Sequence, residues 1–208
     1  MRLIIRDLKK TYDEITIINK AGYAFESNKV YGIVGDRKSG KSTLLECIAG
    51  ETAIDAGYIR LDIMASMKKC DYRDFGFVSN DNILPDYMTG QEYITHCLKV
   101  HNRQAEPEHI REIFSQAGIK DNMVGALIKA YSPEEKLKLK LLTIMIVEPP
   151  VILLDEPTNM RVINWFVERM NKGHIIIVTA ETIEKLPDIC HDILRLHNGV
   201  LEGVTKEN

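Results

Sequence analysis

The sequence has few of the features that mark secreted, membrane-spanning or disulfide-rich proteins. Its four cysteines, Cys47, Cys70, Cys97 and Cys190, form no CxxC pair, so they predict free thiols in a reducing cytoplasm. No apolar run approaches the roughly 18 residues that a membrane-spanning helix requires. Residues 1–7 are too few and too charged for a secretory signal. Any role at a membrane is therefore expected to depend on another polypeptide.

The chain also lacks a basic excess and a second large domain. It carries 27 Lys and Arg against 30 Asp and Glu, a net charge of -3, which gives no general attraction to nucleic acid. Its 208 residues are 45% apolar, which suits one globular domain or one core with an insertion. We expect no nucleic-acid partner.

The chain does contain a glycine loop between an expected strand and an expected helix. Gly35-Asp36-Arg37-Lys38-Ser39-Gly40-Lys41-Ser42-Thr43 fits the pattern GxxxxGK[ST]. Residues 29–34 ahead of it are apolar and β-branched, and residues 41–49 behind it are typical of a helix that stops at Gly50. A chance match in a turn is the alternative, but strand, loop and helix together favour a phosphate site.

The residue types in this loop suit a nucleotide polyphosphate. The first turn of a helix offers unpaired N–H groups and the positive end of its dipole. Glycines let the backbone approach the phosphates closely, Lys41 would reach the β- and γ-phosphates, and the Ser42 hydroxyl would ligate Mg²⁺. The residues expected to contact the nucleotide are Gly35, Lys38, Ser39, Gly40, Lys41, Ser42 and Thr43.

A second segment carries two carboxylates at the end of an apolar run. Residues 150–154 predict a buried parallel strand, followed by Asp155 and Glu156. Ligand sites in such sheets lie beyond the carboxyl ends of the strands. We expect Asp155 to hold Mg²⁺ and Glu156 to polarise an attacking water as the catalytic residue. A pair of solvated acids is the alternative, which the glycine loop makes less attractive.

Strands and helices alternate along the rest of the chain, which predicts an α/β fold with a mostly parallel sheet. An N-terminal antiparallel β subdomain and a helical insertion complete this prediction. The expected strands are 2–7, 15–18, 57–62, 75–78 and 174–178, with a hairpin at 193–201, and the expected helices are 89–100, 106–117, 132–148, 162–170 and 181–191. We expect a single domain, 1–208, with its core at 1–85 and 140–208 and a helical subdomain at about 86–139.

Asp155-Glu156-Pro157-Thr158, the glycine loop and the helical insertion resemble the nucleotide-binding domain of ATP-binding cassette (ABC) transporters, a P-loop NTPase fold. The resemblance covers nearly the whole chain. It implies ATP and Mg²⁺ as cofactors, and an adenine stacked on Tyr12, whose alternative is a surface tyrosine at a strand end. It also implies that Asn80, one methylene shorter than the family's glutamine, contacts the metal and nucleotide.

Three other motifs depart from the family pattern. The LSGGQ signature becomes Tyr131-Ser132-Pro133-Glu134-Glu135, in which Pro133 has no N–H and two glutamates put negative charge where a partner's phosphate is expected. The switch histidine is replaced by Ala180, which cannot contact a phosphate. The family's SGLD-type segment after DEPT is missing, and residues 159–163 follow instead.

These features favour an ATP-binding subunit of an ABC-type transporter, whose ATPase activity is weak or depends on a partner. The resemblance implies a membrane-spanning subunit and a second nucleotide-binding domain, in a homo- or heterodimer, and a cytoplasmic location peripheral to the membrane. The alternative is a nucleotide-responsive regulatory module without significant turnover or a transport partner.

Overall fold

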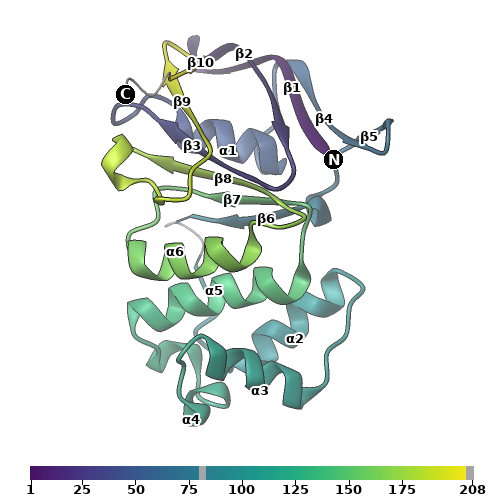
Figure 1. Cartoon of the computed structure of the whole chain (residues 1–208), viewed down its shortest axis with the longest axis vertical. Coiled ribbons are helices and arrows are strands. Elements are labelled where there is room, and N and C mark those ends of the chain that lie inside the picture. The colour runs from purple at the N-terminus through teal and green to yellow at the C-terminus, as the bar shows by residue number, and fades with distance from the viewer. Residues whose placement is uncertain (80–82, 205–208) are drawn as a thin grey trace. The chain divides into compact units, whose positions relative to one another are not determined.

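The computed structural model describes residues 1–79 and 83–204, which form two compact units (Figure 1). The first unit combines Met1–Ser79 with Pro149–Asn208, and the second is Asn80–Glu148. The second unit is longer than the predicted insertion, since one continuous helix runs to its end. Within the described ranges, no helix has both the length and the apolar content that crossing a membrane requires.

An antiparallel sheet in the first unit contains the N-terminus, as predicted. Its order is β2-β1-β4-β5, formed by Ile15–Glu26, Arg2–Tyr12, Ala56–Ile63 and Ser66–Lys69. A turn at Asp13 and Glu14 joins β1 to β2, and both residues have positive φ. Both strands extend well beyond their predicted ends, because register shifts let the ladder continue through polar residues.

A second, mostly parallel sheet carries the ends of the strands on which the expected site depends. Its order is β10-β9-β3-β8-β7-β6. These strands are Val200–Gly203, Asp192–His197, Lys29–Val34, Ile175–Ala180, Val151–Leu154 and Phe75–Val78. Neighbours from β9 to β6 pair in parallel, and only β10 pairs antiparallel, through the predicted hairpin at Asn198 and Gly199. Every residue of β7 and β8 is buried, which explains why both strands are apolar except for Thr179.

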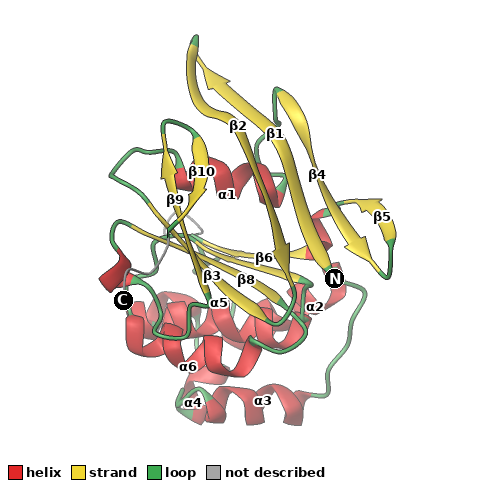
Figure 2. Cartoon of the chain, turned by 45° about the horizontal axis from the view of Figure 1, so that its top comes forward, coloured by secondary structure: helices red, strands yellow, loops and turns green. Residues whose placement is uncertain are grey.

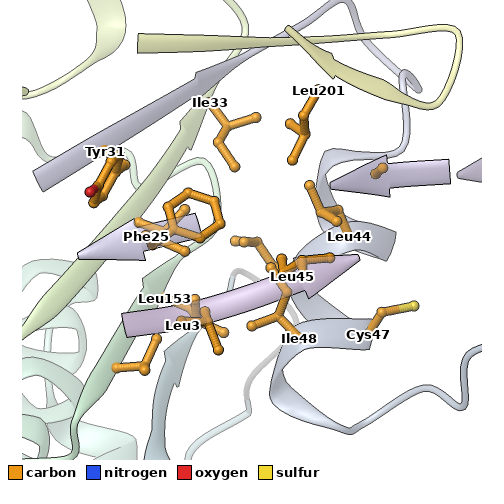
Figure 3. Packing of buried hydrophobic residues seen from close by; sticks show 14 of the residues in the cluster. Leu3, Phe25, Tyr31, Ile33, Leu44, Leu45, Cys47, Ile48, Leu153 and Leu201 are labelled. Carbon is orange, nitrogen blue, oxygen red and sulfur yellow. The ribbon is translucent and has the colours of Figure 1, made fainter. Parts of the chain in front are cut away.

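Two helices cover the faces of the parallel sheet. Helix α1, Lys41–Ala49, lies between the two sheets, and α6, Met160–Met170, lies on the other face of the parallel sheet (Figure 2). Leu44, Leu45 and Ile48 of α1 belong to one buried cluster with Leu3 of β1 and Phe25 of β2 (Figure 3). This apolar packing fixes the start of α1 relative to both sheets, and with it the glycine loop.

The second unit is helical, as predicted. It contains α2, α3, α4 and α5, formed by Gly90–Val100, Pro107–Gln116, Asp121–Val124 and Pro133–Val147. Helices α2 and α5 begin with capping boxes, in which Thr89 pairs with Glu92 and Ser132 with Glu135. The sequence indicates both boxes by their spacing.

The prediction of a helix over residues 181–191 is wrong. Only Ile183–Lys185 forms a single 3₁₀ turn, η3, and the backbone becomes extended at Leu186. Pro187 follows directly, and a residue before proline is disfavoured in the helical region. The buried Leu186 side chain fills the space over Gly32, where an added Cβ would lie 2.3 Å from Leu186 Cδ1. Tertiary packing therefore overrides the local helical pattern.

Candidate functional site

The glycine loop follows β3 and leads into α1, as the sequence predicts. A Cβ at Gly35 would lie 2.6 Å from Ser39 Oγ and 2.7 Å from the carbonyl oxygen of Leu196, so only glycine fits there. Gly40 immediately precedes α1 with φ 97°, and its Cβ would lie 2.7 Å from Ile17 Cγ2. The backbone of the loop is thus held close to two neighbouring strands, and the two glycines of the pattern are sterically required.

The Lys41 side chain is held in place by the glycine loop to which a phosphate would bind. Its side chain is only 3% exposed. Its Nζ donates to the carbonyl oxygens of Gly35 and Asp36, at 2.7 and 2.9 Å, and lies 3.1 Å from Glu156 Oε1. An ammonium group has three donors, so these contacts occupy all of them. A phosphate oxygen therefore has to compete with Glu156 for Lys41.

The start of α1 has unused capacity to bind an anion. Gly40 provides no side-chain cap, and no acidic residue lies in the first turn. In the described part of the chain, the Ser39 hydroxyl oxygen is buried without a hydrogen-bond partner. Unpaired polar groups of this kind are costly unless a ligand completes them. The loop therefore fits a bound phosphate.

The two acids after β7 are placed by hydrogen bonds from both neighbouring strands. The backbone N–H of Asp155 donates to the carbonyl of Val78 at the end of β6 (2.8 Å). The Thr179 hydroxyl, at the end of β8, donates to Asp155 Oδ1 (2.6 Å) and accepts from the backbone N–H of Glu156 (2.9 Å). Glu156 has φ 41°, in the left-handed region. Asp155 and Glu156 therefore lie beside the loop, and Glu156 contacts Lys41 directly.

The donors that the sequence assigns to magnesium are only partly described. Ser42 is exposed in the first turn of α1. Within residues 1–79 and 83–204, the Thr179 hydroxyl engages Oδ1 of Asp155, and Oδ2 has no hydrogen-bond partner. Asn80 lies outside the described residues. In residues 1–79 and 83–204 there is no cluster of three or more His, Cys, Asp or Glu that suits a metal. A hydroxyl and one carboxylate nevertheless fit Mg²⁺, which usually takes its remaining ligands from phosphates and water.

Tyr12 lies at the end of β1 and is 42% exposed. The Lys10 ammonium stands 4.7 Å from the centre of its ring and also donates to the carbonyl of Ala53. The following strand, β2, carries Ile17 against Gly40 of the loop. An exposed aromatic ring on this hairpin is compatible with the predicted adenine contact, which stays a prediction.

The polar groups at the start of α5 form hydrogen bonds with one another. Glu135 accepts from both the backbone N–H and the hydroxyl of Ser132, at 2.8 and 2.7 Å, and its own N–H donates back to the Ser132 hydroxyl. These hydrogen bonds lower the pKa of the Glu135 carboxyl, so it stays ionised. Glu134 pairs with Lys138 at 2.8 Å. The helix start carries negative charge and offers no glycine amides to an anion.

Ala180 ends β8 next to the strand that leads into the loop. It pairs with Val34, the residue before Gly35. The resemblance implies a switch histidine at this position, where this chain has only a methyl group. The next residue, Glu181, forms an ion pair with Lys185 at 2.5 Å, and Lys185, with weaker effects of Arg37 and Lys41, lowers the pKa of the Glu181 carboxyl.

The histidines on either side of β8 and β9 lie at strand ends or on the surface. His191 Nδ1 accepts from the backbone N–H of Val30, and His174 Nδ1 lies 2.7 Å from the carbonyl of Pro149. His197 is exposed at the end of β9. The four cysteines are free thiols, as predicted.

Comparison with known proteins agrees with this geometry. The family model for the ABC transporter domain matches residues 18–159. The chain belongs to the ABC transporter family. Members of this family bind ATP, and the structure confirms the predicted fold class, with its antiparallel sheet, mostly parallel sheet and helical unit.

Individual relatives are distant. The chain is 25% identical over 213 residues to the Bacillus subtilis (strain 168) protein named "Uncharacterized ABC transporter ATP-binding protein YybJ", covering 97% of this chain and 95% of that protein. It is 30% identical to ABC transporter G family member 23 of Arabidopsis thaliana, but spans only 28% of that protein's length. A solved structure described as an ATP binding subunit of an ABC transporter has a TM-score of 0.85, 20% identity, and coverage of 100% of this chain and 91% of that one.

Sequence reasoning missed one polar residue at the site. Thr179 is fully buried, yet its hydroxyl contacts the Asp155 carboxylate and the backbone N–H of Glu156. The signal was present, because Thr179 is the only hydroxyl residue in the otherwise apolar strand Ile175–Ala180. A lone hydroxyl at the carboxyl end of a buried parallel strand needs a polar partner.

Proposed function

We propose that this chain is an ATP-binding subunit of an ABC-type transporter and binds Mg-ATP at residues 35–43. The observation that carries the proposal is the arrangement around Lys41, a buried ammonium held between loop carbonyls and Glu156. A buried cation at the start of an uncapped helix is suited to a polyphosphate. We assign the phosphate contacts to Gly35, Lys38, Ser39, Gly40, Lys41, Ser42 and Thr43, and the adenine contact to Tyr12.

Chemistry at this site requires a rearrangement of Lys41. Binding of the phosphates draws its ammonium from Glu156 toward the β- and γ-phosphate oxygens, which frees the Glu156 carboxylate to polarise a water. Ser42 and Asp155 would hold Mg²⁺, which neutralises developing charge on the phosphates. The contribution of Asn80 to this set stays a prediction.

The same chain is poorly equipped to complete the γ-phosphate site. Ala180 offers no donor to it, and the start of α5 presents Glu134 and Glu135 instead of glycine amides. Groups that stabilise transition-state charge contribute heavily to phosphoryl transfer. We therefore propose that turnover is slow in the isolated chain and depends on a second nucleotide-binding domain that supplies an intact signature.

A heterodimer suits these properties best. The partner's signature would complete the site built on Lys41, while α5 of this chain would face the partner's weaker site. A separate membrane-spanning subunit would then couple ATP binding to transport, and it would place the chain at the cytoplasmic side of the membrane. Several family relatives carry transport functions in their names, including Nod factor export and ribose import, but the cargo of this chain is not inferred from them.

Steady-state ATPase measurements test whether a partner domain is needed to complete the site built on Lys41. We expect the isolated chain to bind Mg-ATP but to hydrolyse it slowly. Its rate should rise at least about 100-fold when a neighbouring subunit with an intact signature is added, because the loss of one transition-state contact already costs about 100-fold. Glu156→Gln, which keeps the side-chain volume, should remove the residual rate. Brisk Mg²⁺-dependent turnover by the isolated chain would contradict the account.

The second candidate function is a nucleotide-responsive regulatory module without a transport partner. The self-capped start of α5 favours it, because this surface has lost its phosphate-binding groups. The placement of Glu156 beside Lys41 favours the ATPase instead, since a sensor has no need of that carboxylate. Co-purification with a polytopic membrane protein separates the two functions.

A further inference from the structure

The hydroxyl of Thr179 connects the two acids that follow β7. Thr179 is 0% exposed. The hydroxyl proton goes to Asp155 Oδ1 at 2.6 Å, and the hydroxyl oxygen accepts the backbone N–H of Glu156 at 2.9 Å. One buried group thus fixes a side chain and the backbone of the following residue at once.

The register of the sheet brings these residues together. Leu154 of β7 pairs with Val178 of β8 in parallel, so the next residues along each strand, Asp155 and Thr179, end side by side. Within the described residues, the Asp155 carboxylate then has Oδ1 engaged by Thr179, while Oδ2 has no hydrogen-bond partner. A carboxylate oriented in this way is pre-organised, because its rotamer no longer has to be selected when the ligand binds.

The backbone of Glu156 needs the same support. Its φ of 41° lies in the left-handed region, which costs a residue other than glycine free energy and persists only where surrounding contacts enforce it. The hydrogen bond from its N–H to the Thr179 hydroxyl is such a contact, and the 3.1 Å contact of its carboxylate with Lys41 is a second.

We propose that Thr179 is a positioning residue that orients Asp155 for the magnesium ion of bound nucleotide and holds Glu156 in its left-handed conformation. This inference rests on the proposed function, since it requires that Mg-ATP binds at the loop. Thr179 touches neither metal nor nucleotide in this role. Its loss acts through Asp155, and therefore reduces the benefit of magnesium more than the affinity for nucleotide itself.

The test compares valine, serine and wild type at residue 179. Calorimetry gives the dissociation constant of a non-hydrolysable ATP analogue in excess Mg²⁺ and in excess EDTA, and the ratio of the EDTA value to the Mg²⁺ value is the magnesium gain. Thr179→Val keeps the branched shape but removes the hydroxyl, and should lower the magnesium gain about tenfold, as typical for partners that orient metal ligands. Thr179→Ser retains the hydroxyl and should keep the wild-type gain.

Affinity in EDTA is the internal control, and we expect it to be the same in all three proteins. A wild-type magnesium gain in Thr179→Val would overturn the proposal, and so would an equal loss of affinity in Mg²⁺ and in EDTA, which indicates a purely structural role. If the valine variant does not fold, Thr179→Cys, with a weak donor and acceptor, replaces it under the same criteria. In each of these outcomes the wild-type protein still binds the ATP analogue, so the proposed function is not contradicted. Absence of binding by the wild type would instead remove the proposed function and this inference together.

Discussion

Lys41→Ala is expected to weaken binding of Mg-ATP by roughly 100-fold or more. The ammonium would contact two phosphates, and each hydrogen bond to a charged group contributes about 1.5–3 kcal/mol. The substitution also leaves the carbonyls of Gly35 and Asp36 without their buried donor. Calorimetric titration of the variant with a non-hydrolysable ATP analogue measures the effect, and unchanged affinity would place the nucleotide elsewhere.

Lys38→Ala is the graded control for this experiment. Lys38 lies in the same loop and carries the same charge, but its side chain is exposed, whereas that of Lys41 is 3% exposed. Screening by water makes exposed charge contacts weak, so we expect a loss of only a few-fold. Equal losses in the two variants would mean that net charge in the loop, and not the buried position of Lys41, governs binding.

The double variant Pro133→Gly with Glu134→Gly is expected to tighten ATP-dependent self-association of the chain about tenfold. It restores a backbone N–H at the start of α5 and removes one of the two acids from the first turn. A tenfold change corresponds to about 1.4 kcal/mol, within the range of one hydrogen bond to a charged group. Light scattering with and without Mg-ATP measures this self-association. Both proteins carry Glu156→Gln, which prevents turnover.

Helix α3 supplies a matched control for that variant. It begins with Glu106-Pro107-Glu108, so Pro107 occupies the same helical position as Pro133, and Glu108 the same as Glu134. Pro107→Gly with Glu108→Gly should destabilise its helix start to a similar degree without changing self-association. An equal response of the two double variants, or none in either, would show that the start of α5 does not face a phosphate.

The phosphate loop could be predicted from the sequence because its pattern specifies chemistry and backbone geometry together. Gly35 and Gly40 are required by contacts closer than any Cβ allows, and Lys41 by its buried position. The capping box of α5 is likewise local, since Ser132 and Glu135 are three residues apart. Features of this kind are encoded within a few residues and do not depend on the rest of the fold.

The contacts among the loop, β7 and β8 could not be predicted, because they depend on sheet register. Thr179 meets Asp155 only because β7 and β8 pair in parallel with Leu154 beside Val178. The contact of Glu156 with Lys41 likewise joins residues far apart in the sequence. Tertiary packing also explains the wrong helix at 181–191, where burial of Leu186 over Gly32 replaced the local pattern.

A crystal structure of the chain with Mg²⁺ and a non-cleavable ATP analogue tests the central claim most directly. The account predicts phosphates against the amides of residues 38–43, the Lys41 ammonium moved from Glu156 to the β- and γ-phosphates, and the metal beside Ser42 and Asp155. An analogue bound elsewhere, with Lys41 still paired to Glu156, would contradict it.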